Sequence, residues 1–509
     1  MAQSPYNTST TENTDNQAFV GEIKVASRIV DYLSSGLYHS PAACLKELIN
    51  NSYDADATVV NVSVKPDADR IVIQDNGHGM SKDDFVTHFE RVSESHKRDS
   101  SDITSHLKRP KIGKIGIGFI AANEICEIME IFSTKAGSTE LLHVTINFSE
   151  MRKPIEERRR DETDFTKADY SGEILESLSE EHYTHIFLEQ VRGEAQNILV
   201  GAGSQSNSTN IKSLYGKSVE SIVTLLKSPE LNSWKDFDFY SETMLQVALN
   251  IPVEYPSNWV PEKLQANLKK FEDEVKRLNF KVSYDGTPLR KPIVFSPGDK
   301  ECFIEPFEFN GKHVSATGYF YAQHGIVKPQ DLHGLLVRIR NAAVAEFDST
   351  FWGFTPSIAP LIQRWVSVEI WADDRLEEAM NIDRRTLREA HPAFVELRDE
   401  LHNRLKKVFD LAKKNLYEAG NKERRADKAI ETRKEIKSAL QTVKMSSAAM
   451  TSVVKMWDDK IDKPSIEKSL LKKYSVAELY SIVIEVAKDV MSDEQLEQFL
   501  KHLTNRLGK

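Results

Sequence analysis

The sequence predicts an α/β fold (α+β) in three parts: an N-terminal α/β sandwich, an α/β middle domain and a helical C-terminal region. Residues 17 to about 195 alternate helical and strand periodicity, as a sheet with helices on one face requires. A Gly-, Ser- and Asn-rich stretch at 201–210 follows, and a mixed pattern resumes after it. From about residue 393 the apolar spacing is almost wholly helical. We therefore expect a disordered leader over 1–16 and domains over 17–200, 211–395 and 396–509.

The individual elements follow from local periodicity and residue type. In the first part, we expect helices over 19–37 and 41–53 and strands over 59–64, 70–74, 141–148 and 184–191. In the second part, we expect a helix over 261–278 and strands over 281–284, 313–322, 334–340 and 366–371. The stretch 421–444 has many charges and few large apolar residues, which suits an exposed or coiled-coil helix.

Length and composition bound the class of protein. The chain has 509 residues, too many for one hydrophobic core, and its 40% apolar and 28% charged residues are ordinary for a globular protein. The three cysteines, Cys44, Cys126 and Cys302, share no metal-ligand or redox spacing, which favours a reduced compartment. The polar first sixteen residues lack a secretory pattern, and no apolar run is long enough to span a bilayer. We expect a cytoplasmic protein without a membrane partner.

The segment PAACLKELINNSYDADA, residues 41–57, places an acid and an amide on one helical face. Glu47 and Asn51 are four residues apart, and Asp54 lies three further on, near the same stripe. An amide oxygen can hold Mg²⁺ together with phosphate oxygens, and a carboxylate can orient and deprotonate an attacking water. The same spacing is also common on solvated helix surfaces, so this motif has two interpretations on its own.

Two glycine motifs follow. In IVIQDNGHGM, residues 71–80, a β-rich run leads into Asp75 and two glycines, which form either a tight turn or a close backbone approach to a ligand. An aspartate at a strand end can accept a hydrogen bond from an adenine amino group. In KIGKIGIGFIAA, residues 111–122, three glycines precede an apolar helical stretch. A glycine loop that opens a helix presents N–H groups to phosphate.

In this order and spacing, the three motifs resemble those of the GHKL ATPase superfamily. That superfamily includes gyrase, the ninety-kilodalton heat-shock chaperone, sensor histidine kinases and MutL-type repair proteins. ELINNSYDA resembles its first box, DNGHGM its second and GKIGIGF its third. The resemblance implies a Bergerat α/β sandwich that binds ATP and Mg²⁺, with a mobile lid over residues 80–111.

The resemblance also implies a role for each matching residue. Glu47 would be the general base, Asn51 the Mg²⁺ ligand and Asp54 a supporting acid near the nucleotide. Asp75 would read the adenine. The other implied nucleotide contacts are Gly77, Gly79 and Met80 around the base, Gly113, Lys114, Gly116, Gly118 and Phe119 in the phosphate loop, Lys97 in the lid and Thr184 near the adenine.

The middle of the chain resembles the middle domain of the heat-shock chaperone. MNIDRRTL, residues 380–387, aligns Arg384 with the arginine that reaches the γ-phosphate in that chaperone, and GLLVRIRNAAVAEF, residues 334–347, resembles one of its strands. The second part would thus be a transducer-like domain. A permanently charged guanidinium from another domain can sense the γ-phosphate. Asp383 replaces the usual serine, and Arg385 is a rival for the role.

These features predict a Mg²⁺-dependent ATPase that acts as an ATP-gated clamp or chaperone-like switch and forms a homodimer when ATP binds. A protein client or effector is the expected partner. Residues 396–509 carry 24 Lys+Arg against 19 Asp+Glu, whereas the rest of the chain has a net charge of −15. This basic region leaves nucleic acid open as a partner, and with it a DNA-associated repair-type or anti-phage ATPase. A histidine-type kinase fits less well, because His39 lies in a loop beside Pro41 rather than on a helix.

Overall fold

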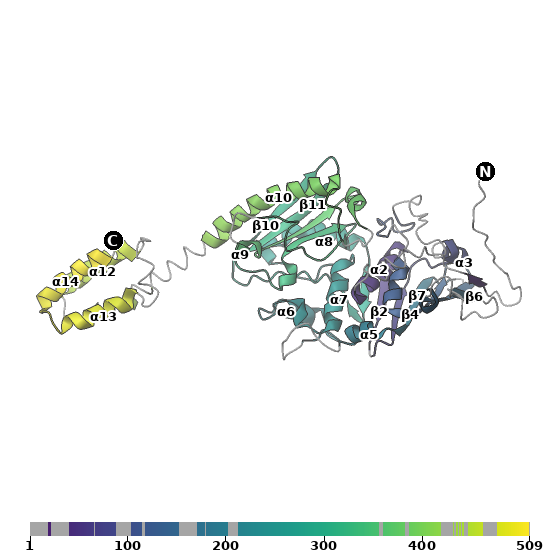
Figure 1. Ribbon diagram of the computed structural model, residues 1–509, viewed down its shortest axis with the longest axis horizontal. Coiled ribbons are helices and arrows are strands. Elements are labelled where there is room, and N and C mark those ends of the chain that lie inside the picture. Colours follow the sequence, from purple (N-terminus) through teal and green to yellow (C-terminus); the bar gives the residue numbers. More distant parts are fainter. Residues whose placement is uncertain are drawn as a thin grey trace. The chain divides into compact units, whose positions relative to one another are not determined.

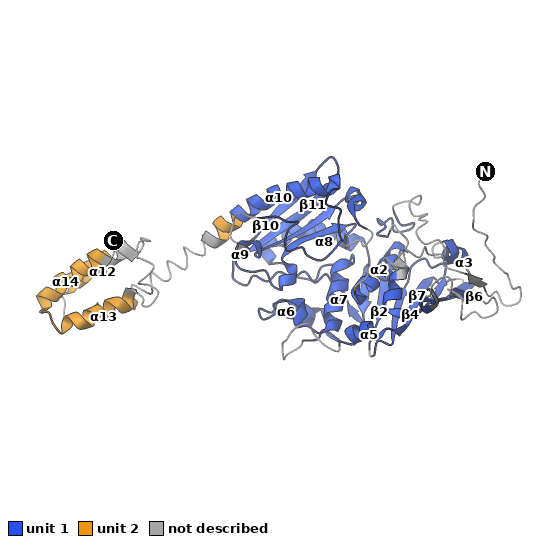
Figure 2. Ribbon diagram, in the orientation of Figure 1, with its two compact units in different colours: residues 1–410 blue, residues 411–509 orange. Residues whose placement is uncertain are grey.

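The computed structural model divides the chain into two compact units, residues 1–410 and 411–509, which we call the main unit and the C-terminal unit (Figure 2). The described residues are 19–21, 40–65, 67–87, 103–113, 118–151, 170–178, 180–201, 212–355, 360–381, 386–418, 446–461 and 476–507, with short pieces between 431 and 441. The expected leader over 1–16 lies outside them. Among the described helices, none is both long and apolar enough to cross a lipid bilayer.

The main unit contains a nine-stranded sheet in the order β1-β6-β5-β4-β7-β3-β2-β8-β9. Strands β2, β4, β6 and β7 of this sheet are labelled in Figure 1. Neighbouring strands are antiparallel, except for β2 and β8, which are parallel. Buried and exposed residues alternate along β2: Val60 and Val62 are buried, and Val59, Asn61 and Ser63 are exposed. One face of the sheet at this strand is therefore covered. The strands are β1 Phe19–Gly21, β2 Val59–Ser63, β3 Arg70–Asp75, β4 Cys126–Thr134, β5 Glu140–Asn147, β6 Tyr170–Glu176, β7 Tyr183–Val191, β8 Lys281–Tyr284 and β9 Thr287–Pro288.

A helical layer lies against this sheet. It is formed by the α-helices α2 (Pro41–Asp54), α5 (Gly193–Val200) and α7 (Phe239–Asn250) and the 3-10 helix η4 (Gly118–Glu124), which pack on one another. The short helices α3 (Lys82–Phe85) and α4 (Phe148–Met151) follow β3 and β5. Buried apolar side chains from Ala42 to Ala343 form one continuous core, which therefore crosses the expected boundary between the first and middle domains.

The second sheet of the main unit has five strands in the order β10-β11-β14-β12-β13. β12 and β14 are parallel and the other neighbours are antiparallel. The strands are β10 Cys302–Asn310, β11 Ser315–Gln323, β12 Gly334–Ile339, β13 Ala342–Ala343 and β14 Val366–Ala372. The accompanying helices are α6 Val219–Leu226, η6 Trp234–Asp236, α8 Glu262–Arg277, η7 Gln330–Leu332, α9 Pro360–Gln363, η8 Asp374–Ala379 and α10 Pro392–Ala412.

The C-terminal unit is helical. Its described helices are the π-helix η9 (Lys413–Glu418) and the α-helices α12 (Ser447–Ile461), α13 (Val476–Lys488) and α14 (Asp493–Leu507). A small core of its own includes Val453, Tyr480 and Leu500. Most of the charged stretch 421–444 lies outside the described residues. The mixed α/β class with a helical C-terminal region is thus confirmed.

The expected elements differ from the structure in two ways. The helix expected over 19–37 is wrong at its start, because Phe19–Gly21 pair with β6 as an edge strand, and residues 22–37 lie outside the described ranges. Strands β4, β6 and β10 were not expected. Glutamates interrupt their apolar runs, and the alternation that identifies a strand is then weak in the sequence.

Strand β8 comes from the expected middle domain but extends the first sheet. It runs parallel to β2, with Val59 opposite Lys281 and Val62 opposite Tyr284. The carboxylate of Asp285 then accepts hydrogen bonds from the backbone N–H groups of Val64 (2.7 Å) and Lys65 (3.2 Å). The first sheet therefore takes its edge from a segment beyond residue 211.

A buried ion pair joins the second sheet to the helical layer. Arg338 of β12 and Glu369 of β14 are both fully buried and hydrogen-bonded to each other. The hydroxyls of Tyr319 (2.6 Å) and Tyr255 (2.9 Å) also donate to the Glu369 carboxylate, while Arg338 donates to the Leu249 carbonyl of α7 (2.9 Å). Burial raises the pKa of both tyrosines, which keeps them neutral donors. Such a pair is costly to break, because one charge would be left without its partner in a dry interior.

Glu369→Gln is expected to lower the free energy of unfolding by about 3–5 kcal/mol, because Arg338 would keep a buried charge without an anion. Urea denaturation followed by tryptophan fluorescence would measure the loss. Glu308→Gln is the matched control, since Glu308 pairs with Lys270 in solvent, and it should cost less than about 1 kcal/mol. If the two variants lost the same free energy of unfolding, the buried Arg338–Glu369 pair would be no more important for stability than an exposed pair.

Candidate functional site

Helix α2 presents Glu47 and Asn51 on one face. The helix begins at Pro41, and the hydroxyl of its N-cap residue Ser40 accepts a hydrogen bond from the Ala43 N–H. Its buried stripe includes Leu45, Leu48, Ile49 and Ser52, which packs the helix on the sheet. Glu47 and Asn51 are half-buried beside this stripe, one helical turn apart.

Under α2, three polar residues form a row across neighbouring strands. Asp75 of β3 lies opposite Thr184 of β7, and Thr184 lies opposite Ser133 of β4. All three are buried. The hydroxyls of Ser133 and Thr184 are 2.9 Å apart, and Ser133 also donates to the Tyr183 carbonyl (3.0 Å). Pairing of β3, β7 and β4 thus brings together residues that are far apart in the chain.

The Asp75 carboxylate is a buried acceptor that α2 helps to hold. The Ser52 hydroxyl donates to one of its oxygens (2.7 Å), and the Gly77 N–H donates to the other (2.8 Å). Burial raises the pKa of Asp75 above its usual value, although these hydrogen bonds act in the opposite direction. A carboxylate offers about four lone-pair positions, so Asp75 has acceptor capacity for the polar group of a ligand.

The turn after Asp75 is fixed on both sides. The His78 N–H donates to the Ala55 carbonyl at the end of α2 (2.9 Å), and the Met80 N–H donates to the Ser133 hydroxyl (2.8 Å). At Gly79, φ is +70°, and a Cβ atom would lie 1.8 Å from the Thr134 carbonyl oxygen. A Cβ atom on Gly77 would lie 2.7 Å from the Ala55 carbonyl oxygen. The two glycines are therefore required by close backbone packing.

Asp54 holds the start of the glycine-rich segment. Its two carboxylate oxygens accept hydrogen bonds from the backbone N–H groups of Ile112 and Gly113, each at 2.7 Å. Both oxygens thus bind the protein backbone at the entry to the predicted phosphate loop. Downstream, Gly118 and Phe119 begin helix η4, which packs on α2. The predicted site residues Lys97, Lys114 and Gly116 lie outside the described residues.

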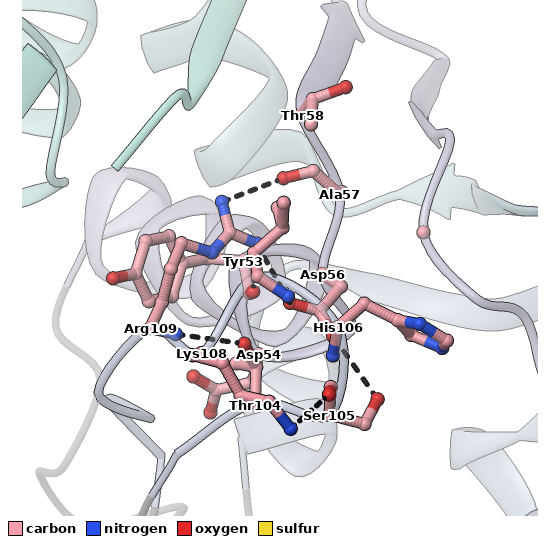
Figure 3. Close-up of polar contacts among 12 residues, drawn as sticks. Tyr53, Asp54, Asp56, Ala57, Thr58, Thr104, Ser105, His106, Lys108 and Arg109 are labelled. Atoms are coloured by element: carbon pink, nitrogen blue, oxygen red, sulfur yellow. Dashed lines mark hydrogen bonds and ion pairs between the residues drawn. The ribbon is translucent and has the colours of Figure 1, made fainter. Parts of the chain in front are cut away.

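A second anchor lies just after α2, where sequence reasoning assigned no role (Figure 3). The Asp56 carboxylate accepts hydrogen bonds from the Ser105 hydroxyl (3.2 Å) and from the N–H groups of His106 (2.8 Å) and Leu107 (3.1 Å). Burial acts to raise the pKa of Asp56, but hydrogen bonds from the 104–107 turn outweigh it and lower the pKa below its usual value.

Arg109 completes this anchor. Its buried guanidinium donates to the carbonyls of Tyr53 (2.6 Å), Ala57 (3.0 Å) and Leu278 (3.1 Å) and lies over the Tyr53 ring (Figure 3). Hydrogen bonds from such a rigid, permanently charged fork are stronger than neutral ones. The chain on both sides of residue 109 is therefore fastened to the end of α2.

The site residues that sequence reasoning missed are Ser52, Ser133, Asp56 and Arg109. Ser52 and Ser133 carried a usable signal, because each is a polar residue on an otherwise apolar buried face. Arg109 had no such signal in the sequence, because its partners are backbone carbonyls that only folding brings close to it.

The predicted second-domain arginine Arg384, with its rival Arg385, lies outside the described residues. Within the described ranges, no three His, Cys, Asp or Glu side chains gather as metal ligands. The predicted Mg²⁺ ligand Asn51 stays on the half-buried face of α2.

Residues 38–180 match the family described as "Histidine kinase-, DNA gyrase B-, and HSP90-like ATPase". This range contains α2, the Asp75 turn and the glycine-rich segment.

Three curated relatives match part of the chain. The chain is 34% identical over 176 residues to the "Putative type II restriction enzyme HgiDII" of Herpetosiphon aurantiacus. The aligned residues make up 35% of this chain and 27% of that protein. This chain is 27% identical over 153 residues to "Chaperone protein HtpG" of Mesorhizobium japonicum, covering 26% and 24% of the two chains. It is 31% identical over 150 residues to HtpG of Methylobacterium sp. (strain 4-46), covering 25% and 24%. The chain thus spans about a quarter of the length of these relatives.

Gly79→Ala is expected to lower the free energy of unfolding by about 3–5 kcal/mol, because the added Cβ atom would overlap the Thr134 carbonyl and the residue would keep a positive φ. Gly137→Ala is the matched control. Gly137 also has a positive φ (+84°), but nothing lies within 4 Å of its added Cβ atom, so the cost should be only about 1–2 kcal/mol. Thermal and urea unfolding would measure both, and a Gly79 variant no worse than the control would contradict the close packing.

Proposed function

We propose that this chain, whose residues 38–180 match a family of ATPases, is a GHKL ATPase that binds and hydrolyses ATP with Mg²⁺ and uses the cycle as a conformational clamp. The observation that carries the proposal is the buried row of Asp75, Thr184 and Ser133 beneath the helix that presents Glu47 and Asn51. The row offers the Asp75 carboxylate and the Thr184 hydroxyl to a flat polar base, and Ser133 holds Thr184 in place. The helix offers an acid and an amide to phosphates and metal.

The base-recognition end of the site fits an adenine. Asp75 already accepts two hydrogen bonds and keeps lone pairs for an amino group. The Ser133 hydroxyl donates to the Tyr183 carbonyl and accepts from the Met80 N–H, so the Thr184 hydroxyl donates to Ser133. The Thr184 oxygen keeps a lone pair that can accept a hydrogen bond from a purine amino group. Gly77 and Gly79 let the turn after Asp75 pack closely on the Ala55 and Thr134 carbonyls, and Met80 follows them as an adaptable apolar contact.

The phosphate end is assigned to α2 and the glycine-rich segment. The Asn51 side-chain oxygen is a hard ligand of the kind that Mg²⁺ prefers, and the metal would neutralise phosphate charge. Backbone N–H groups of the loop that contains Gly113, Lys114, Gly116 and Gly118 would contact phosphate oxygens. Glu47 would orient a water and take its proton, as a half-buried carboxylate one helical turn from Asn51 can.

The clamp part of the proposal rests on the connection between the two sheets. They share one apolar core, and Arg338 bonds to α7, which packs on α2. A change at the nucleotide site can therefore be transmitted to the second sheet through rigid packing. We propose that Arg384 reads the γ-phosphate and that ATP binding favours a homodimer acting on a macromolecular partner.

A DNA-associated or anti-phage ATPase is the second candidate. The relative named as a restriction enzyme and the basic composition of residues 396–509 favour it. DNA retention that falls with added salt would support this candidate. A protein retained by the ATP-bound Glu47→Ala chain, without DNA, would support the clamp acting on a protein.

Glu47→Ala should still bind ATP but turn it over at least about 100-fold more slowly, because a general base contributes about 10²–10⁴-fold to rate. Phosphate release would measure turnover, and calorimetry would measure ATP affinity. Glu308→Gln is the control for removal of an acidic side chain. Glu308 forms an exposed ion pair with Lys270 and is far from Glu47 in the sequence. Normal turnover by Glu47→Ala would remove Glu47 from the role of base.

Asp75→Asn should lose nucleotide binding while the protein stays folded. The asparagine oxygen can still accept from the Gly77 N–H, and its amide can donate to the Ser52 hydroxyl, whose own proton can turn to the Leu48 carbonyl (3.4 Å). The amide cannot, however, accept at every position that the carboxylate offers to adenine. Calorimetry would detect the loss, and unchanged ATP affinity would refute the adenine assignment.

The same variant has an expected dependence of stability on pH. Because the pKa of Asp75 is raised in the folded state, the wild-type protein loses stability as pH rises through that pKa. The asparagine side chain of the variant does not titrate. The stability of Asp75→Asn relative to wild type should therefore increase from acid to neutral pH, and urea titrations at several pH values would measure it.

A further inference from the structure

We infer that Arg340 is a positioning residue through which the second sheet holds the entry of the glycine-rich loop. Arg340 lies in the turn between β12 and β13, and it contacts the backbone carbonyl of Lys111 directly before Ile112 and Gly113. The inference rests on the proposed ATPase function and adds a residue that no sequence motif had assigned.

The backbone at Arg340 is unusual for its residue type. Ile339 pairs with Ala342, so Arg340 and Asn341 alone form the turn, and both have positive φ values (+53° and +66°). Such two-residue hairpin turns favour Asn and Gly, and an arginine there is uncommon. An uncommon residue at a strained position points to a role for its side chain.

The Arg340 side chain, 3% exposed, is held from three directions. Its Nε bonds to Asp374 (2.7 Å), its Nη2 lies 3.3 Å from the Glu377 carboxylate, and its Nη1 donates to the Lys111 carbonyl. Asp374 and Glu377 belong to η8, which follows the last strand of the second sheet in the chain. The rigid guanidinium thus fixes the Lys111 carbonyl relative to the second sheet.

The segment 111–113 is held on its other side by α2. Asp54 accepts from Ile112 and Gly113, as described above, so the three consecutive residues lie between the ATPase helix and the second sheet. A second contact supports the same interface. The ammonium of Lys46, next to Glu47 on α2, donates to the Ala343 carbonyl (3.3 Å) in β13. Movement of the β12–β13 turn relative to α2 would therefore displace Gly113 from Asp54.

Helix η8 is also bonded to the chain on both sides of residues 382–385, which lie outside the described residues. Met380 pairs with Leu387, the Asn381 N–H donates to the Thr386 carbonyl (2.9 Å), and the Arg388 N–H donates to the Ala379 carbonyl (2.7 Å). Arg340 therefore contacts both the Lys111 carbonyl and the helix that leads into this pairing.

Arg375 of η8, the helix that Arg340 contacts, provides a matched control. Its guanidinium is 45% exposed and bonds to Asp373, the Ser315 hydroxyl and the Lys312 carbonyl, all within the second-sheet region. Arg375→Ala removes a guanidinium that is hydrogen-bonded within the second-sheet region but leaves the contact between Arg340 and the Lys111 carbonyl in place. A difference between the two variants therefore isolates the contact with the glycine-rich loop.

The first measurement is hydrogen exchange at residues 104–113 without nucleotide. Arg340→Ala should raise the exchange rates of the Ile112 and Gly113 amides at least about tenfold, because their hydrogen bonds to Asp54 would lose support from the other side. Arg375→Ala should not change them. This readout does not require ATPase activity, so it tests the positioning role even if the proposed function fails. Unchanged exchange in Arg340→Ala would overturn the inference.

The second measurement is steady-state ATP hydrolysis with ADP affinity by calorimetry. Arg340→Ala should lower kcat about 10- to 100-fold, as misplacement of a positioning group does, while the Kd for ADP changes less than about threefold. Arg340→Lys keeps the charge but replaces the planar guanidinium fork with a single ammonium nitrogen, so its kcat should lie between those of Arg340→Ala and wild type. Wild-type kcat in Arg340→Ala, or an equal loss in Arg375→Ala, would overturn the inference. Failure of the wild-type chain to bind ATP would instead refute the proposed function.

Discussion

The hydrogen bonds made at the last turn of α2 and just beyond it are the constraint on which the site depends. Within a few residues, the Ser52 hydroxyl holds Asp75, the Asp54 carboxylate holds Ile112 and Gly113, and the Ala55 carbonyl holds the turn at His78. Asp56 and Arg109 add a further set of bonds to the 104–109 segment. These are short-range, directional interactions, several of them with charged groups, and they fix three separate motifs to one rigid helix. The catalytic and binding roles proposed above all assume this geometry.

Two kinds of buried charge serve different purposes in the main unit. The Arg338–Glu369 pair is held by tyrosine hydroxyls and a helix carbonyl, and it links sheet to helix as a fixed support. Asp75 accepts its hydrogen bonds from a serine hydroxyl and a backbone N–H, and burial raises its pKa. A group that is costly to bury and retains acceptor capacity is more typical of a binding site than of a support. The difference in partners thus distinguishes the supporting ion pair from Asp75, which we propose binds a ligand.

The family match covers residues 38–180. About a quarter of each relative aligns, and the three relatives carry two different names, a restriction enzyme and a chaperone. The second sheet and the helical C-terminal unit lie outside residues 38–180, so their roles have to be argued from their own contacts. The grip of Arg340 on the Lys111 carbonyl gives one physical route by which the second sheet could respond to the nucleotide site. Because Arg340 belongs to a turn of the second sheet, the position of the glycine-rich loop depends on both halves of the main unit.

The sequence by itself determined the elements whose causes are local. Helix α2 follows from its N-cap serine, first-turn proline and apolar stripe, and a turn after β3 follows from the two glycines Gly77 and Gly79. It also determined which motifs occur and in which order. The tertiary structure alone decided that β8 joins the first sheet, that Ser52 and Ser133 surround Asp75, that Asp54 binds backbone, and that Arg109 and Arg340 hold carbonyls far along the chain. The physical reason is that propensity and capping act over a few residues, whereas the partner of a buried polar group is chosen by strand pairing and packing between distant segments.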